Sequence, residues 1–292
     1  MSRTELAYEE YGAKNHLGED EKRVRIFIER LDEGIKYVKK SGCKNIVLES
    51  HLAGRSKPVV DLSFLSKLID IESFGIGFLL SKKTDIKPIY GLKNLLELET
   101  IKNFKIDISK FPKLRAILSE NLEDEIEFAE SCNTVTHLYL HPRSRNLKFL
   151  GSFKNLQYLR LLTTGIESLD GIDKLTSLKE LIIRGAPKLK DINAASISKS
   201  LEYLLIESAK KLTDYSALAG NDSIKELNIS HAISVEFIPK MKKIEYLSTG
   251  NVVDGNLWPL MESSTLLSVY MYPQKRHYSH KLSELENHFN SK

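Results

Sequence analysis

The chain has 292 residues, of which 41% are hydrophobic and 28% are charged, and its formal net charge is +4. These proportions are typical of a globular protein and exclude a disordered chain. No apolar run approaches the roughly 18 residues that span a bilayer, and the polar residues 1–25 lack the apolar core of a secretory signal. We therefore expect a cytoplasmic protein without a membrane anchor.

The sequence contains none of the common motifs for a metal or a cofactor. Cys43 and Cys132 stand far apart and belong to no CxxC pair, so neither a disulfide framework nor a zinc site is indicated, and both are expected to be inert. No P-loop, G-x-G-x-x-G or H-E-x-x-H segment occurs. We expect no cofactor, no metal and no enzymatic activity.

Residues 1–42 differ in pattern from the rest of the chain. Residues 23–29 alternate like a strand, and residues 29–42 have the pattern of a helix that ends at Gly42. This segment is predicted to form an N-terminal cap.

From Cys43 onward the pattern L-x-x-L-x-L recurs with a mean spacing of about 22 residues, inside the range of leucine-rich repeats. About eleven units follow one another. They begin at Cys43, Leu68, Leu95, Leu114, Val135, Leu156, Leu178, Leu201, Ile224, Ile244 and Leu266.

The segments between the strands also repeat. Apolar residues recur at every third position, as in Ile166, Leu169, Ile172 and Leu175 before Leu178. A period of three suits a 3-10 turn or coil. A run of amphipathic helices is the alternative, but it requires apolar residues at i+4 and i+7 as well.

This pattern resembles the 22-residue repeats of the bacterial internalin-like leucine-rich-repeat family, and the resemblance covers about residues 43–272. That family usually has asparagine at the ninth position of the unit, where this chain has Asn103 once and Thr164, Ala186, Ala209 and Ala232 elsewhere. The expected fold is therefore α/β, a leucine-rich-repeat solenoid over residues 43–273. It has a parallel concave β-sheet and short 3-10 or coil returns. Residues 274–292 form a C-terminal cap or tail, with a short helix over 280–289.

The repeat register predicts which side chains face outward from the sheet. Side chains alternate across a strand, so the third, fifth and seventh positions of each unit line the concave face. These 33 positions carry nine acids against two arginines, a net −7, which leaves +11 on the rest of the chain, and they hold six of the 12 tyrosines. Tyrosine is enriched in protein interfaces. The predicted partner-binding residues are Asp70, Glu72, Glu97, Glu99, Glu120, His137, Tyr139, His141, Tyr158, Arg160, Arg184, Tyr203, Glu207, Tyr246 and Tyr270.

The acids gather at the N-terminal end of this face. The register places Asp70 beside Glu97 and Glu72 beside Glu99, about 5 Å apart on neighbouring strands. Like charges directly opposite each other destabilise a sheet, so a cation is expected to neutralise them. Lysines or arginines of a basic protein partner are the first choice, and calcium is the weaker one, because no loop of calcium-ligand spacing is present.

The sequence thus indicates a non-catalytic scaffold that captures a protein with a basic contact surface. A toxin-neutralising immunity protein is a narrower version of this hypothesis. The alternative is an enzyme or enzyme regulator that uses the region of His137, Tyr139 and His141, where Glu120 can lie next to His141. The two histidines are about 13 Å apart on one strand, too far for one metal ion. Specific nucleic-acid binding is not expected, because an acidic face repels phosphate.

Overall fold

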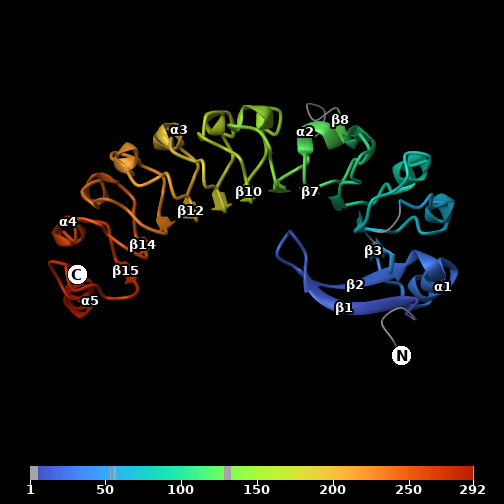
Figure 1. The fold of residues 1–292 in the computed structure, drawn as a ribbon, viewed down its shortest axis with the longest axis horizontal. Coiled ribbons are helices and arrows are strands. Elements are labelled where there is room, and N and C mark those ends of the chain that lie inside the picture. Colours follow the sequence, from blue (N-terminus) through green and yellow to red (C-terminus); the bar gives the residue numbers. More distant parts are fainter. Residues whose placement is uncertain (1–5, 53, 55–56, 128–132, 292) are drawn as a thin grey trace. The chain divides into compact units, whose positions relative to one another are not determined.

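The computed structural model describes residues 6–52, 54, 57–127 and 133–291. The chain divides into two compact units, Met1–Tyr139 and Leu140–Lys292. In each unit, strands line one side and the short helices of the return segments lie on the other side (Figure 1).

The first unit begins with an antiparallel hairpin and continues with parallel strands. Its strands hydrogen-bond in the order β1-β2-β3-β4-β5-β7-β9, and β6 pairs with β8 separately. The strands are β1 (Tyr8–Lys14), β2 (Asp20–Phe27), β3 (Asn45–Glu49), β4 (Ser73–Ile76), β5 (Glu97–Glu99), β6 (Ile106–Asp107), β7 (Ala116–Ser119), β8 (Ile126–Glu127) and β9 (His137–Leu140). The helices are α1 (Leu31–Ser41) and α2 (Leu122–Glu125), with 3-10 turns at Ile28–Arg30, Ser63–Lys67, Lys87–Gly91 and Ile108–Lys110.

The second unit consists of regular repeats. Its strands hydrogen-bond in sequence order and are parallel from β10 to β15. They are β10 (Tyr158–Leu162), β11 (Glu180–Arg184), β12 (Tyr203–Glu207), β13 (Glu226–Ile229), β14 (Tyr246–Thr249) and β15 (Ser268–Met271). The returns hold α3 (Asn193–Ser196), α4 (Trp258–Glu262) and 3-10 turns at Lys148–Leu150, Ile172–Lys174, Ser216–Leu218 and Ile238–Lys240, and α5 (Leu282–Asn290) follows the last strand.

The core lies between the strands and their returns. The triplet residues Ile166, Leu169, Ile172 and Leu175 are all at most 1% exposed, and Ile172 opens a 3-10 turn as predicted. The fourth and sixth positions of the units are buried as well, for example Leu181 and Ile183 of β11. Each repeat therefore buries its leucines against its own return and against the neighbouring repeats.

The predicted register is confirmed for ten of the eleven strands and wrong for β4. Each of the ten begins at the third position of its predicted unit, whereas β4 begins at Ser73, three residues after Asp70. Ser73 aligns with both Asn45 and Glu97. Phe74, predicted on the concave face, is 1% exposed and belongs to the core.

The error at β4 has a clear physical cause. Leu62, Leu65, Leu68 and Ile71 form a triplet series of buried residues, so Leu68 closes a return segment and Ile71 opens the unit. The fifth and seventh positions of this unit are Gly75 and Gly77, which do not stand out in a leucine pattern.

The ends of the chain carry the secondary structure that their patterns predict. Residues 23–29 fall largely in β2, and α1 ends at Gly42 in the left-handed conformation (φ 67°). At the other end, α5 corresponds to the helix predicted over 280–289. Strand β1 was not predicted.

Two further expectations concern cysteines and membranes. Burial raises the pKa of the Cys43 thiol, which disfavours the reactive thiolate, while Cys132 lies outside the described residues. Among the described residues, no helix is both long and apolar enough to cross a bilayer.

Gly171 provides a test of how tightly the returns stack. Its φ is +103°, and a Cβ on Gly171 would lie 2.5 Å from the backbone nitrogen of Lys148 in the preceding repeat. Gly220 also has a positive φ (+81°), but a Cβ on Gly220 would meet no atom within 4 Å. Gly220→Ala should cost about 1–2 kcal/mol through the left-handed backbone alone. Gly171→Ala should cost about 1–3 kcal/mol more because the backbones must separate. Urea denaturation of both variants measures the difference, and equal losses would mean that the close approach is not energetically important.

Candidate functional site

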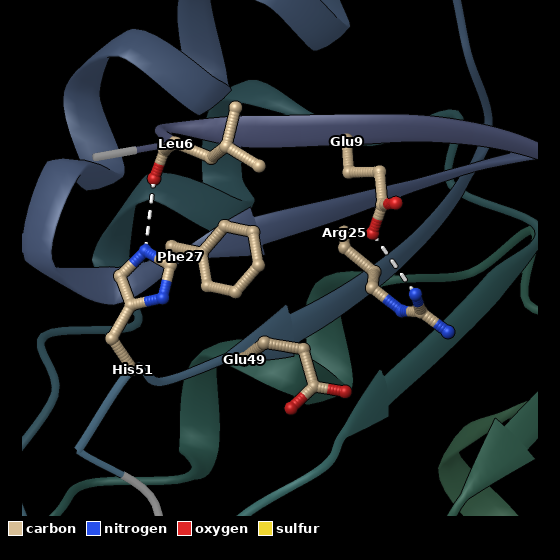
Figure 2. A pocket seen from close by; sticks show the side chains of 6 residues that line it. All are labelled: Leu6, Glu9, Arg25, Phe27, Glu49 and His51. Atoms are coloured by element: carbon tan, nitrogen blue, oxygen red, sulfur yellow. Dashed lines mark hydrogen bonds and ion pairs between the residues drawn. The ribbon is translucent and has the colours of Figure 1, made fainter. Parts of the chain in front are cut away.

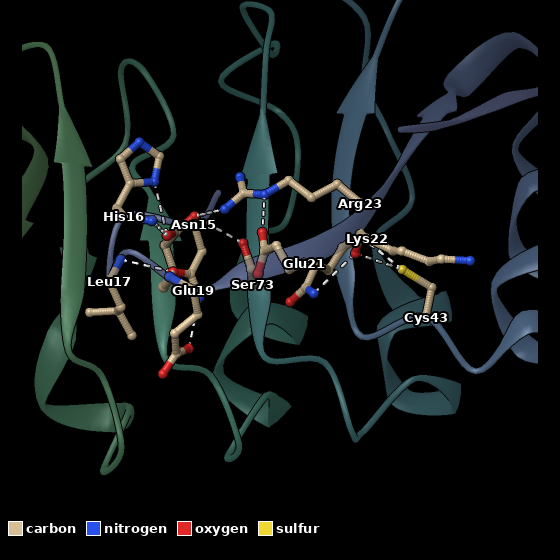
Figure 3. Close-up of polar contacts among 11 residues, drawn as sticks. Asn15, His16, Leu17, Glu19, Glu21, Lys22, Arg23, Cys43 and Ser73 are labelled. Carbon is tan, nitrogen blue, oxygen red and sulfur yellow. Dashed lines mark hydrogen bonds and ion pairs between the residues drawn. The ribbon is translucent and has the colours of Figure 1, made fainter. Parts of the chain in front are cut away.

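The face of the sheet that points away from the returns is called the open face here, and in the first unit the N-terminal hairpin reaches onto it. Strand β2 pairs in parallel with β3, at the edge of the repeat sheet. The loop at the hairpin tip is shaped by Asn15, whose Oδ1 accepts hydrogen bonds from the backbone of Leu17 (3.0 Å) and Glu19 (2.8 Å). In Figure 3 this loop and β2 extend over the repeat strands.

Glu97 of β5 anchors the hairpin. Its carboxylate accepts from the backbone nitrogen and Nδ1 of His16, each at 2.9 Å, from Oγ of Ser73 at 3.1 Å, and from the guanidinium of Arg23. Glu97 is 3% exposed and Arg23 is 8% exposed. Burial alone would raise the pKa of Glu97, but the hydrogen bond and charge of His16 and the charge of Arg23 lower it to about 2. Arg23 also pairs with Glu21.

This arrangement overturns the predicted acid cluster. Ser73, not Asp70, lies opposite Glu97. Glu72 pairs with Lys44 at 2.7 Å, and Asp70 is exposed in the turn before β4. The cation that neutralises Glu97 comes from the same chain, as Arg23, and His16 adds two hydrogen bonds to the same carboxylate.

Glu99 keeps an acidic neighbour, but a different one from that predicted. Gly75 and Gly77 leave room for two carboxylates: a Cβ at Gly75 would lie 2.6 Å from Glu99, and one at Gly77 would lie 2.5 Å from Glu49. Burial raises the pKa of both acids, and the charge of Glu49 raises that of Glu99 further. Neither carboxylate has an ion pair within the described ranges.

Glu49 also lines a small pocket of about 260 Å³ with Leu6, Glu9, Arg25, Phe27 and His51. Arg25 forms an ion pair with Glu9 at 3.0 Å. The rings of Phe27 and His51 stack with their centroids 3.9 Å apart (Figure 2).

The histidine region contacts the N-terminal hairpin. Tyr139 donates from its hydroxyl to the backbone oxygen of His16 (2.8 Å), and the two rings meet edge to face. Burial lowers the pKa of His137, as do the charges of Arg115 and His16. His141 is exposed just after β9. Within the part of the chain that the structure describes, no three His, Cys, Asp or Glu side chains gather as a metal site requires.

Glu120 was predicted as a possible neighbour of His141. It is exposed and pairs with Lys102 at 2.6 Å, so its carboxylate already has a cationic partner in its own unit.

In the second unit the register lines up an alternating row of tyrosines and glutamates, called the Tyr–Glu row here. Neighbouring strands place its members side by side from β10 to β14: Tyr158, Glu180, Tyr203, Glu226 and Tyr246. The three tyrosines are partly buried and Glu180 is exposed. Burial raises the pKa of Tyr203, and so do the charges of Glu226 and Glu180 on its two sides.

A groove of about 400 Å³ lies along this row. It is lined by Lys179, Glu180, Glu202, Tyr203, Lys225, Glu226, Glu245 and Tyr246. Lys225 is held by Glu202 at 2.8 Å, and Glu226 accepts a hydrogen bond from Asn228 at 3.0 Å. Neither Glu180 nor Glu226 forms an ion pair with another described residue.

The remaining predicted residues flank this row. Arg184 and Glu207 pair with each other at 3.0 Å. Arg160 has a buried Nε with no acceptor among the described residues. Tyr270 is 58% exposed on β15.

Sequence and structure comparisons differ in what they find. No family model and no curated protein sequence matches the chain. An internalin (InlF) from Listeria monocytogenes is structurally similar with a TM-score of 0.55 and 14% identity, covering 90% of this chain and 84% of that one. The Toll-like receptor in a TLR13–ssRNA13 complex is similar with a TM-score of 0.52 and 17% identity, and the match covers 82% of this chain but only 42% of the receptor. At these identities the likeness concerns the fold alone, and the chain is a leucine-rich-repeat solenoid that resembles the bacterial internalins in fold.

Proposed function

We propose that this protein is a non-catalytic scaffold that binds another protein through the open face of its second unit. The observation that carries the proposal is the Tyr–Glu row, in which Glu180 and Glu226 stand between tyrosines and have no ion pair among the described residues. Tyrosine contributes large contact area at a low cost in conformational entropy. Carboxylates without cationic partners complement a basic surface.

The contact surface proposed here is narrower than the sequence predicted. In the observed register, Ser73, Gly75 and Gly77 take the outward positions that the sequence pattern assigned to Asp70, Glu72 and Phe74. The 33 outward positions then carry seven acids against two arginines, a net charge of −5. Four of these acids belong to the first unit, where Glu97 is already paired by the hairpin. The proposal therefore relies on the local Tyr–Glu row and not on an acidic field over the whole face.

The narrower hypotheses are affected differently. A basic toxin remains one partner of the proposed class, although the net charge that favoured it has decreased, and a toxin-like reading frame next to the gene would support it. For the enzyme alternative, the hydroxyl of Tyr139 donates to the hairpin at His16, and Nδ1 of His137 lies 2.8 Å from the hydroxyl of the preceding residue, Thr136. We propose a structural role for this pair.

Matched charge variants test the proposed function. Glu180→Gln/Glu226→Gln removes two charges from the open face, and Glu236→Gln/Glu286→Gln removes two exposed charges elsewhere in the second unit. The partner is isolated from the source organism on the immobilised protein, identified by mass spectrometry and then titrated. We expect the first variant to bind it about tenfold or more weakly and the control to bind like the wild type. Equal affinity of all three proteins would refute the proposal.

A further inference from the structure

The spacing of the Tyr–Glu row carries information about the shape of its ligand. Glu180 lies on β11 and Glu226 on β13, with Tyr203 of β12 between them in register. Neighbouring strands are about 4.8 Å apart, so the two carboxylates are borne by backbone positions about 9.6 Å apart across the sheet.

Each glutamate is flanked by two aromatic rings. Tyr158 and Tyr203 stand on either side of Glu180, and Tyr203 and Tyr246 stand on either side of Glu226. An arginine that enters such a position can pair with the carboxylate and place its planar guanidinium against a tyrosine face. Among the described residues no cation forms an ion pair with either glutamate: Arg184 and Lys225 pair with other acids, and Lys179, which lines the same groove, is in no ion pair with them.

The distance between the two positions distinguishes the possible backbones of a ligand. Polyproline II rises about 3.1 Å per residue with three residues per turn, so residues i and i+3 share a face about 9.3 Å apart. In a β-strand, side chains i and i+2 are about 6.6 Å apart and i and i+4 about 13 Å. An α-helix brings i and i+7 to about 10.5 Å, but its width of about 10 Å also presses the intervening side chains onto Tyr203.

We propose that the open face of the second unit recognises an extended, polyproline II-like segment of the partner, which crosses the strands and carries two arginines at positions i and i+3. The two arginines bind Glu180 and Glu226, and the two residues between them pass over Tyr203 without pointing at the sheet. This inference rests on the proposed function, since it names the part of the partner that the same face binds.

The groove along the row fits this orientation. Its lining residues are the first residue of each of the four consecutive strands β11 to β14 and the residue directly before it, so the hollow runs across the strands and not along one of them. It has a volume of about 400 Å³ and carries four glutamates against two lysines. A cationic segment lying in it therefore meets carboxylates along its length.

Synthetic peptides of fixed spacing test the proposal. Ac-Gly-Arg-Pro-Pro-Arg-Gly-NH₂ is compared with a peptide in which threonine alone separates the arginines and with an alanine-based helix that carries them at i and i+7. Binding to the full chain is followed by NMR, using tyrosine side-chain resonances assigned by Tyr203→Phe and Tyr246→Phe. We expect the Pro-Pro peptide to bind about tenfold more tightly than either other peptide. It should lose about tenfold in affinity for Glu180→Gln/Glu226→Gln and none for Glu236→Gln/Glu286→Gln.

The outcomes separate this inference from the proposed function. Preference for the threonine-spaced or helical peptide, or equal binding of the Pro-Pro peptide to the wild type and the Glu180→Gln/Glu226→Gln variant, overturns the extended-segment inference. If the same variant still loses the native partner, the scaffold function stands and only the shape of the ligand is wrong. If the native partner binds all variants alike, the proposed function itself fails.

Discussion

Arg23→Met is expected to lower the free energy of unfolding by about 3–5 kcal/mol, because it leaves buried carboxylates without their cation. The Arg23 guanidinium reaches both Glu97 and Glu21, and the side chains of these three residues are at most 10% exposed. Methionine keeps most of the aliphatic length, so the loss reports the charge and its hydrogen bonds more than the packing. Urea denaturation at pH 7 gives the difference.

Arg25→Met is the matched control on the same strand. Arg25 pairs with Glu9, and both side chains are more than 40% exposed, while the guanidinium lies 4.4 Å from the ring of Tyr11. An exposed pair and an exposed cation–π contact should cost about 1 kcal/mol or less when removed. Similar losses for the two variants would mean that the hairpin is held by its strand pairing and not by the Glu97 centre.

The repeats were predictable because they are local. A leucine at a fixed position in a unit of about 22 residues has the same neighbours in every unit, so pattern and packing coincide. Leu159, Leu181, Leu204 and Leu227 follow the pattern, and all are fully buried. Where the unit length changed, around Leu68, the pattern allowed two alignments, and the triplet series through Leu65 and Leu68 to Ile71 distinguishes them.

The hairpin could not be predicted to the same extent. Residues 15–18, Asn-His-Leu-Gly, carry a turn signal, and Gly18 adopts φ +85°. However, Tyr8–Lys14 is an edge strand with largely exposed side chains, so no alternation of apolar residues marks it. Its decisive contact joins His16 to Glu97 across 81 residues, and no local pattern encodes such a distance.

The hairpin also changes what the acids of the first unit mean. The sequence pattern predicts the same role for Glu97 and Glu99, as two outward-facing carboxylates that bind a cationic partner. In the structure, Glu97 is buried under a cation, whereas Glu99 is only partly buried and lies beside another acid. Charge counted along a sequence therefore does not reveal which carboxylates are available, since the chain itself neutralises some of them.

Glu97→Gln and Glu99→Gln are expected to change stability in opposite directions at pH 7. The pKa of Glu97 is lowered from 4.5 to about 2 by His16 and Arg23, which outweigh burial, and such a shift corresponds to about 3 kcal/mol of stability. Glu97→Gln should lose an amount of this order. The pKa of Glu99 is raised by burial and by Glu49. The folded state therefore disfavours its charge, and Glu99→Gln should gain stability.

The pH dependence gives the stricter test of these two variants. The stability due to ionised Glu97 is complete above pH 4.5 and is lost as the pH falls toward 2, so the deficit of Glu97→Gln should shrink over that range. Ionised Glu99 destabilises the folded state. This loss of stability is absent when the carboxyl is protonated, and it grows as the pH rises above 4.5 through the raised pKa of Glu99. The advantage of Glu99→Gln should thus appear only on the neutral side. Denaturation curves between pH 3 and pH 8 measure both trends. A loss of stability in both variants at pH 7 would show that the hairpin centre does not distinguish the two acids, because opposite effects require that cations outweigh burial at Glu97 and that burial and Glu49 outweigh cations at Glu99.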